Sequence, residues 1–161
     1  MFKSYLNKPN LSRGLRNNNP GNLVKTSIAW HGKVPHSQNK DTRFEQFIEL
    51  RYGIRAKMRD VINDIFKGKN TVTKLINEFA PAFENNTVAY IANVANALGI
   101  LPTAVITTIS EEFLIDLCKA ISKVENGSQM DGFITDQDYF DAIAILGKTQ
   151  IPVVDSKKKI R

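Results

Sequence analysis

The sequence predicts a mainly helical α+β domain, and three observations support this fold class. From Phe47 onward, apolar residues recur at intervals of three or four, the spacing of one face of a helix. Before Phe47 the apolar stretches are short and are interrupted by Gly32 and Pro35, which favours a small β hairpin near the N-terminus. Apolar residues make up 42% of the 161 residues and charged residues 24%, which is typical of a globular domain with a core.

The N-terminal part of the chain predicts an irregular segment followed by the hairpin. Residues 1–22 end in a dense cluster of turn-forming residues, which reads NNNPGN over residues 17–22. Residues 23–47 alternate short apolar stretches with polar ones, as expected of a hairpin or a loose sheet.

Five helices are expected after this hairpin, each with one apolar face. They cover residues 47–67, 71–80, 87–98, 110–125 and 135–146. Their expected N-terminal caps are Thr71, Thr87, Ser110 and Thr135, and their expected terminators include Gly68, Gly99 and Gly147. The length fits one domain over residues 1–152, with a flexible basic tail over residues 153–161.

The composition excludes several classes of protein. One cysteine, Cys118, cannot form an internal disulfide, and two histidines without a nearby cysteine make a metal centre unexpected. No apolar run approaches the ~20 residues of a membrane span, and the first residues lack the apolar stretch of a secretory signal. We therefore expect a domain that is made in the cytoplasm, contains no membrane span and needs no metal or other cofactor.

The positive charge is concentrated at the N-terminus. The formal net charge is +6, yet residues 1–40 contain seven bases and no acid. A basic segment of this kind favours a polyanionic partner: nucleic acid, anionic lipid or the acidic polymers of a bacterial wall. Nucleic acid is not expected, because the sequence has neither interleaved aromatic and basic residues nor a helix-turn-helix pattern.

Glu125 occupies an unusual position for an acid. It falls in the last turn of the helix expected over residues 110–125, where exposed carbonyl groups favour Lys or Arg. A carboxylate is disfavoured there, more so if it is partly buried, so the side chain should keep its proton more readily. A proton donor in catalysis needs this property. The alternative is a solvated surface glutamate before an Asn-Gly helix end.

Several segments of the chain are similar to a known protein family. They read RGLRNNNPGNL over residues 13–23, WHG over 30–32, RFEQF over 43–47, YGIRA over 52–56, APAFENNTVAYI over 80–91 and AISKVENG over 120–127. Together they resemble a family of small bacteriophage proteins, described as virion structural proteins or lytic enzymes, that open with an Arg-Gly-Ile-Arg-Asn-Asn-Asn-Pro-Gly-Asn motif. Residues 130–135 look like a short insertion relative to this family.

This family in turn resembles the lysozyme-like lytic transglycosylases. In those enzymes a helix ends in the catalytic glutamate, and an Asn-rich turn, a hairpin and a Glu-Thr…Tyr segment follow. Here the turn and hairpin come first, Glu84 and Tyr90 follow, and the helix that ends in Glu125 comes last. No acid precedes Asp41, so the resemblance implies a circularly permuted lysozyme-like domain.

The resemblance implies a phage peptidoglycan-degrading enzyme, such as an endolysin or a virion-associated lytic transglycosylase. Glu125 would act as the single acid and base, with no cofactor and no metal. The expected partners are bacterial peptidoglycan and other virion proteins, and the expected location is the virion, or the periplasm and cell wall after synthesis in the host cytoplasm. The alternatives are a muramidase that hydrolyses the glycan, and a non-catalytic virion protein that keeps the fold and binds cell wall.

Glu84, Asp41 and Tyr90 are expected to have secondary catalytic or substrate-orienting roles. Asp41 is either a second carboxylate that makes hydrolysis possible or a turn residue. Glu84 lies at a helix start, where an acid is stabilised as a carboxylate, so it suits substrate orientation better than proton donation. Tyr90 either hydrogen-bonds the glutamate or a sugar, or packs in the core.

A further set of polar and aromatic residues is expected to bind the glycan. Amide groups can recognise N-acetyl groups and hydroxyls, although asparagines are also good turn residues. Trp30 either stacks on a sugar or packs in the core, while Arg13 and Arg16 either pair with wall carboxylates or brace the turn. The predicted substrate-binding residues are Asn17, Asn18, Asn19, Asn22, Arg16 and Trp30.

Overall fold

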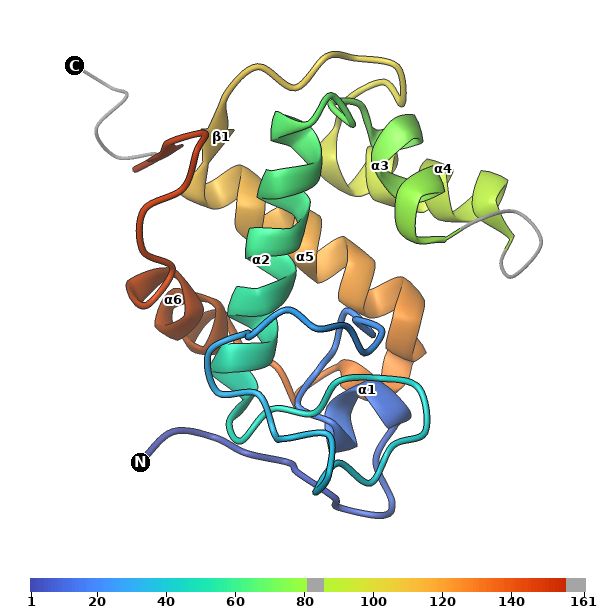
Figure 1. Cartoon of the computed structure of the whole chain (residues 1–161). Coiled ribbons are helices and arrows are strands. Elements are labelled where there is room, and N and C mark those ends of the chain that lie inside the picture. The colour runs from blue at the N-terminus through green and yellow to red at the C-terminus, as the bar shows by residue number, and fades with distance from the viewer. Residues whose placement is uncertain (81–85, 156–161) are drawn as a thin grey trace. The chain divides into compact units, whose positions relative to one another are not determined.

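The computed structural model describes residues 1–80 and 86–155 and is mainly helical, as the sequence predicts (Figure 1). The chain divides into two compact units. The first consists of Met1–Met58 and Glu125–Gly147, and the second consists of the described residues of Arg59–Val124 and Lys148–Arg161. The single domain predicted over residues 1–152 stays a prediction.

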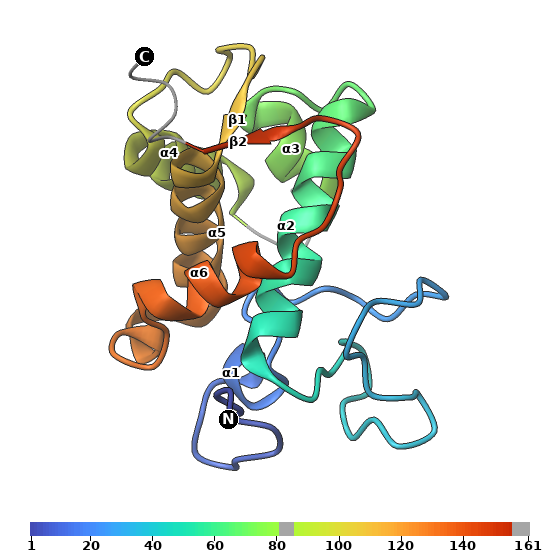
Figure 2. The same cartoon turned by 90° about the vertical axis from the view of Figure 1, so that its left-hand side faces the viewer.

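The first unit contains α1 (Arg13–Arg16), the N-terminal half of α2 (Leu50–Phe66), the last two residues of α5 (Glu111–Asn126), the 3-10 helix η1 (Gly127–Met130) and α6 (Asp136–Ala144). Helix α1 begins where the Ser12 side chain accepts a hydrogen bond from Leu15 N, and it interrupts a segment that we predicted to be irregular. The Arg55 guanidinium donates to Ile145 O at 2.7 Å and so attaches the C-terminal end of α6 to α2. Figure 2 shows the end of α6 beside α2.

The predicted N-terminal hairpin is only partly formed. Among residues 23–47, all of which are described, the structure has two isolated antiparallel bridges, Val24↔Phe44 and Lys33↔Phe47, and no named strand. The reason is that many of the polar backbone groups in this segment bond to side chains instead of to a continuous ladder: Lys40 N, for example, donates to Gln46 Oε1.

The second unit contains the rest of α2 and α5 together with α3 (Val72–Phe79), α4 (Thr87–Leu98) and a small sheet. Figure 2 shows its two short strands, β1 (Ile109–Ser110) and β2 (Val153–Val154). They pair in parallel, with Ile109 opposite Val153. Within the tail predicted over residues 153–161, Val153 and Val154 form β2, and residues 156–161 lie outside the described residues, so the tail stays a prediction.

The helix boundaries agree with the cap chemistry at most positions. Thr71 caps α3 by accepting from Lys74 N at 3.1 Å, and Gly99 ends α4 with a left-handed φ of 67°. Two predictions were wrong. Helix α4 is capped by Asn86, whose side chain accepts from Ala89 N, rather than by Thr87, and α2 begins at Leu50, because Phe47 is in a β-bridge.

The helices bury the apolar faces that the sequence predicts. A fully buried Leu, Ile or Met side chain contributes about 1.5–3 kcal/mol relative to an exposed one, so these faces account for much of the stability. The residues with no more than 1% exposure include Leu50, Ile54 and Met58 in the first unit and Val61, Ile62, Leu75, Ile76, Leu114, Leu117 and Ile121 in the second. Within the described residues, no helix is both long and apolar enough to cross a membrane.

Candidate functional site

Glu125 lies in the last turn of α5, as predicted, and contacts the Asn-rich turn. Its Oε1 accepts a hydrogen bond from Asn22 Nδ2 at 3.0 Å, although Asn22 lies 103 residues earlier in the chain. The Glu125 side chain is half-buried. The first unit thus brings together the two features singled out by the sequence, the misplaced acid and the asparagine cluster.

Asn126 fixes the end of α5 against α1 and the turn. Its Nδ2 donates to Pro20 O at 2.7 Å, and its Oδ1 accepts from Ser12 Oγ at 2.9 Å. Gly14 makes this approach possible, since a Cβ at that position would lie 2.2 Å from Asn126 Oδ1. The position of Glu125 relative to the turn is therefore set by the residue that follows it.

The turn itself uses asparagine where most residues would be strained. Asn18 and Asn22 have φ values of 52° and 51°, in the left-handed region that asparagine tolerates better than most residues. Asn22 has a second notable property, because its Oδ1 is buried and accepts no hydrogen bond from the described residues. Buried acceptors without a hydrogen-bond partner are rare in folded proteins, because leaving such a group unsatisfied costs free energy.

Asn17, Asn18 and Asn19 are buried, with exposures of 1%, 0% and 0%, and their amides bond within the protein. Asn17 donates to Asp41 Oδ2 and accepts from Gln46 Nε2, each at 2.9 Å. Asn18 accepts from Tyr5 N and donates to Phe47 O, and Asn19 bonds to the backbone of Leu23 and Glu45. The structure gives these three side chains the turn-forming role rather than direct contact with a glycan.

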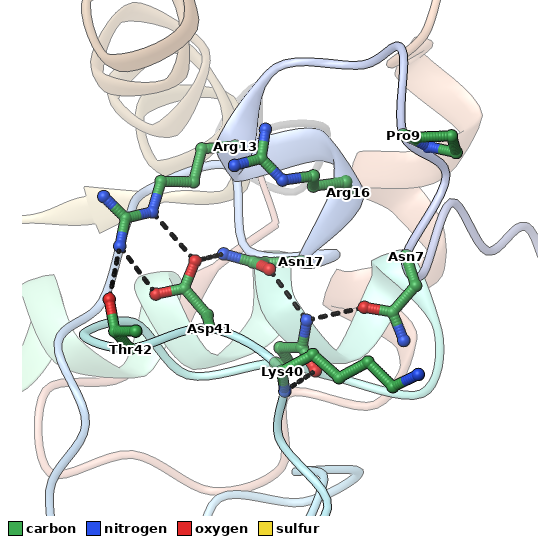
Figure 3. Close-up of a pocket in the computed structure, with 9 residues that line it drawn as sticks. Asn7, Pro9, Arg13, Arg16, Asn17, Lys40, Asp41 and Thr42 are labelled. Atoms are coloured by element: carbon green, nitrogen blue, oxygen red, sulfur yellow. Dashed lines mark hydrogen bonds and ion pairs between the residues drawn. The ribbon is translucent and has the colours of Figure 1, made fainter.

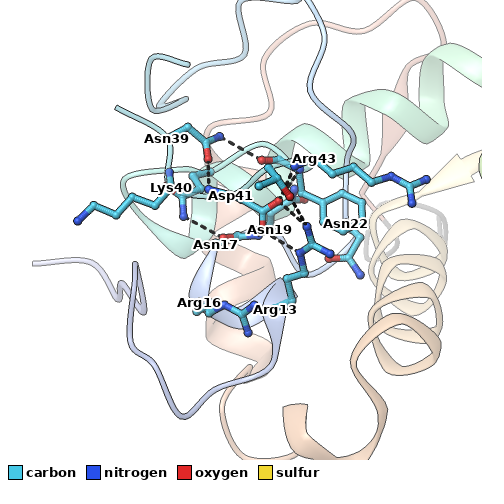
Figure 4. Close-up of polar contacts among 12 residues, drawn as sticks. Arg13, Arg16, Asn17, Asn19, Asn22, Asn39, Lys40, Asp41 and Arg43 are labelled. Carbon is cyan, nitrogen blue, oxygen red and sulfur yellow. Dashed lines mark hydrogen bonds and ion pairs between the residues drawn. The ribbon is translucent and has the colours of Figure 1, made fainter. Parts of the chain in front are cut away.

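Asp41 also has a fully occupied side chain (Figure 4). Arg13 donates to both carboxylate oxygens, at 2.8 and 2.9 Å, and the backbone N–H groups of Arg43 and Phe44 donate to Oδ1. The hydrogen bond from Arg13, followed by those from Phe44, Asn17 and Arg43, holds the pKa of Asp41 far below its usual range despite partial desolvation. Asp41 therefore remains a carboxylate at neutral pH and suits the turn role.

A cavity of about 500 Å³ adjoins this network in the same unit (Figure 3). Arg13, Arg16 and Asn17 of the α1 region form one side, and the loop around Lys40 and Asp41 forms another. Sequence reasoning had not proposed Lys40 or Gln46 as site residues. Gln46 lies in the RFEQF segment, which was a usable signal, but nothing local marks Lys40. The full lining is Asn7, Pro9, Arg13, Arg16, Asn17, Lys40, Asp41, Thr42 and Gln46.

The remaining candidates are not gathered around Glu125 by any described contact. Arg16 donates to Leu11 O at 3.2 Å and lines the cavity, and Trp30 is half-buried in the loop of residues 25–33. Tyr90 belongs to the second unit, is 2% exposed and packs edge-to-face on Phe79, which agrees with the core alternative. Glu84 lies outside the described residues.

Two further observations concern ionic groups. Glu45 is completely buried and bonds Lys33 at 3.0 Å and His36 at 2.8 Å, so it ties together the loop of residues 33–45. Within residues 1–80 and 86–155, no three His, Cys, Asp or Glu side chains are grouped as metal ligands.

No protein-family model matches the chain. The chain is 35% identical over 132 residues to Protein P5 of Pseudoalteromonas phage PM2. The alignment covers 80% of this chain and 78% of that protein. The chain belongs to the Protein P5 family. Each of the two units makes up about half of the chain, so an alignment over 80% of the chain includes residues of both.

Proposed function

We propose that this member of the Protein P5 family is a lysozyme-like lytic transglycosylase that cleaves the glycan strands of peptidoglycan, with Glu125 as its acid and base. The observation that supports the proposal is the hydrogen bond between Asn22 Nδ2 and Glu125 Oε1. It joins a half-buried carboxyl group at a helix end to the Asn-rich turn, the pair of features on which the resemblance to lytic transglycosylases rests.

The chemistry needs one carboxyl group that changes protonation state twice. Glu125 first donates its proton to the glycosidic oxygen, and the bond to C1 breaks. The resulting carboxylate then takes the proton of the substrate's C6 hydroxyl as that oxygen attacks C1, so the product is a 1,6-anhydro sugar and no water is consumed. The Asn22 amide N–H, which donates to Glu125 Oε1 at 3.0 Å, holds the carboxyl group in one orientation during both steps.

The hydrogen bonds that the Asp41 carboxylate already accepts favour transglycosylation over hydrolysis. A hydrolase of the usual type requires a second carboxylate to activate water or to attack the sugar. Asp41, the residue we considered for that role, already accepts hydrogen bonds from Arg13, Asn17 and two backbone N–H groups. It is therefore committed to the loop.

The decisive experiment replaces Glu125 and analyses the products released from purified peptidoglycan by mass spectrometry. Glu125→Gln should lower the release of anhydro-ended products at least about 100-fold with little change in the melting temperature. The matched control is Glu111→Gln, the same change in the first turn of the same helix, which should retain activity. Release of anhydro ends by Glu125→Gln at the wild-type rate would refute the assignment, and reducing ends from the wild type would indicate a muramidase.

A second candidate function is a non-catalytic virion protein that keeps the fold and binds cell wall. One observation favours it: three of the four asparagines expected to contact the glycan are buried within the turn. In that case both the wild-type protein and Glu125→Gln would sediment with peptidoglycan, and neither would release products.

A further inference from the structure

We propose that the cavity beside α1 binds a carboxylate group of the peptide stems of peptidoglycan. This inference deepens the proposed function and depends on it for the identity of the ligand. The cavity has a volume of about 500 Å³, which is ample for the end of a short peptide, and all of its lining residues belong to the first unit.

The charge of the lining favours an anion. Three bases, Arg13, Arg16 and Lys40, surround a single acid, Asp41. Arg13 offsets that acid through two hydrogen bonds, so the charges of Arg16 and Lys40 are not balanced by any other lining residue. A concave surface with an excess of one sign concentrates the field inside it.

The hydrogen-bond acceptors of the lining are already in use (Figure 3). Both Asp41 oxygens accept bonds, from Arg13 among others. The Gln46 amide group donates to Asn17 Oδ1 and to Asn7 Oδ1, each at 2.9 Å, and its own oxygen accepts from Lys40 N. A ligand that needs acceptors from these amide and carboxylate oxygens therefore finds them engaged.

Donors, by contrast, are left over. Among the described residues, no hydrogen bond or ion pair involves the Lys40 ammonium or the Asn7 amide nitrogen, and Lys40 is exposed. Arg16 uses NH1 on Leu11 O, which leaves further N–H groups of the same guanidinium. Ammonium, guanidinium and amide N–H groups around one space, without spare acceptors, match a carboxylate, which only accepts hydrogen bonds.

The position of the cavity connects it to the proposed site. Arg13 and Gly14 are consecutive residues of the short helix α1: Arg13 lines the cavity, while Gly14 contacts Asn126, the residue after Glu125. In a peptidoglycan strand the sugars are neutral and the carboxylates belong to the attached peptides. A glycan held at Glu125 therefore has its negative charge on side branches, where a donor-rich cavity on the same helix can hold it.

The test measures binding by isothermal titration to the full-length protein. The probes are a disaccharide-tetrapeptide with free carboxylates, the same compound with its carboxylates converted to amides, and inorganic phosphate at matched ionic strength. The wild-type protein should bind the acid form about tenfold more tightly than the amide form. Lys40→Gln should weaken binding of the acid form about fivefold and leave the amide form unchanged. The matched control, Lys67→Gln, changes an exposed lysine of the second unit and should have no effect.

Each contrary result has a separate meaning. Equal binding of the acid and amide forms, or equal effects of Lys40→Gln and Lys67→Gln, would overturn the proposal, and so would tighter binding of phosphate than of the acid form. If the wild type releases no glycan fragments but still prefers the acid form through Lys40, the proposed enzyme function fails and the carboxylate site stands. If it releases anhydro fragments without that preference, the enzyme function stands and the carboxylate site fails.

Discussion

The Cα of Gly53 lies against the backbone carbonyl of Asn18, so closely that a Cβ at position 53 would fall 1.6 Å from Asn18 O. This contact joins the first turns of α2 to the Asn-rich turn. It gives a physical reason for the glycine in the YGIRA segment, because backbone atoms cannot yield as a flexible side chain can.

Gly53→Ala should therefore destabilise the protein by about 3 kcal/mol, through overpacking against backbone, with a clear fall in the melting temperature. Gly68→Ala is the comparison, because the added methyl group meets no atom within 4 Å. The only strain in this variant comes from the backbone φ of 102° at position 68, which alanine disfavours. It should cost about 1 kcal/mol. Equal effects of the two variants would contradict the contact.

Gly14 and Asn126 should be energetically coupled. Gly14→Ala places a methyl group on Asn126 Oδ1 and should destabilise the first unit by about 2 kcal/mol. Asn126→Ala removes the obstructing amide, so the double variant should be more stable than the sum of the two single changes by about 1 kcal/mol. Chemical denaturation of the four proteins measures this coupling, and additive effects would show that the two side chains do not meet.

Asn22→Gly isolates the role of the amide beside Glu125. Glycine accepts the φ of 51°, so the backbone of the turn is retained while the donor to Glu125 Oε1 is lost. We expect the rate of anhydro-product release to fall at least about tenfold with little change in KM, because the carboxyl group is no longer held in place. A wild-type rate in this variant would exclude a positioning role for Asn22.

The Arg13–Asp41 ion pair should make the free energy of unfolding depend on pH. The pKa of Asp41 is lowered in the folded protein, so its contribution is present above the unfolded-state pKa of about 3.9 and is lost as the pH falls toward the folded-state value. Asp41→Asn should cost about 2 kcal/mol at pH 7, and the difference from the wild type should shrink below about pH 4. Urea titrations at pH 7 and pH 3 provide the measurement, and a constant difference between them would contradict this account.

Periodicity located the helices well because their apolar faces and caps are local signals. Thr71 and Gly99 act as the cap rules require, and Asp138 accepts from Thr135 N in the predicted capping box of α6. The segment of residues 23–47 was less predictable. Its shape depends on buried side chains that replace a ladder of backbone bonds, such as Glu45 between Lys33 and His36.

In the candidate site, too, the local features could be predicted from the sequence and the long-range contacts could not. The position of Glu125 at a helix end could be predicted from α5 alone, but nothing in the sequence predicted its hydrogen bond with Asn22, which lies 103 residues earlier. The structural role of Asn17 and the cavity around Lys40 could not be read from the sequence. Both follow from where the loop of residues 39–46 meets α1, and no local pattern encodes that meeting.

The long separation between Asn22 and Glu125 also governs when the site can come into being during synthesis. After it has added Asn22, a ribosome must add 103 further residues before the chain contains Glu125. Nascent or prematurely terminated chains thus contain the asparagine turn without its acid. If the enzyme acts as we propose, an infected cell that accumulates such fragments carries no wall-cutting species among them.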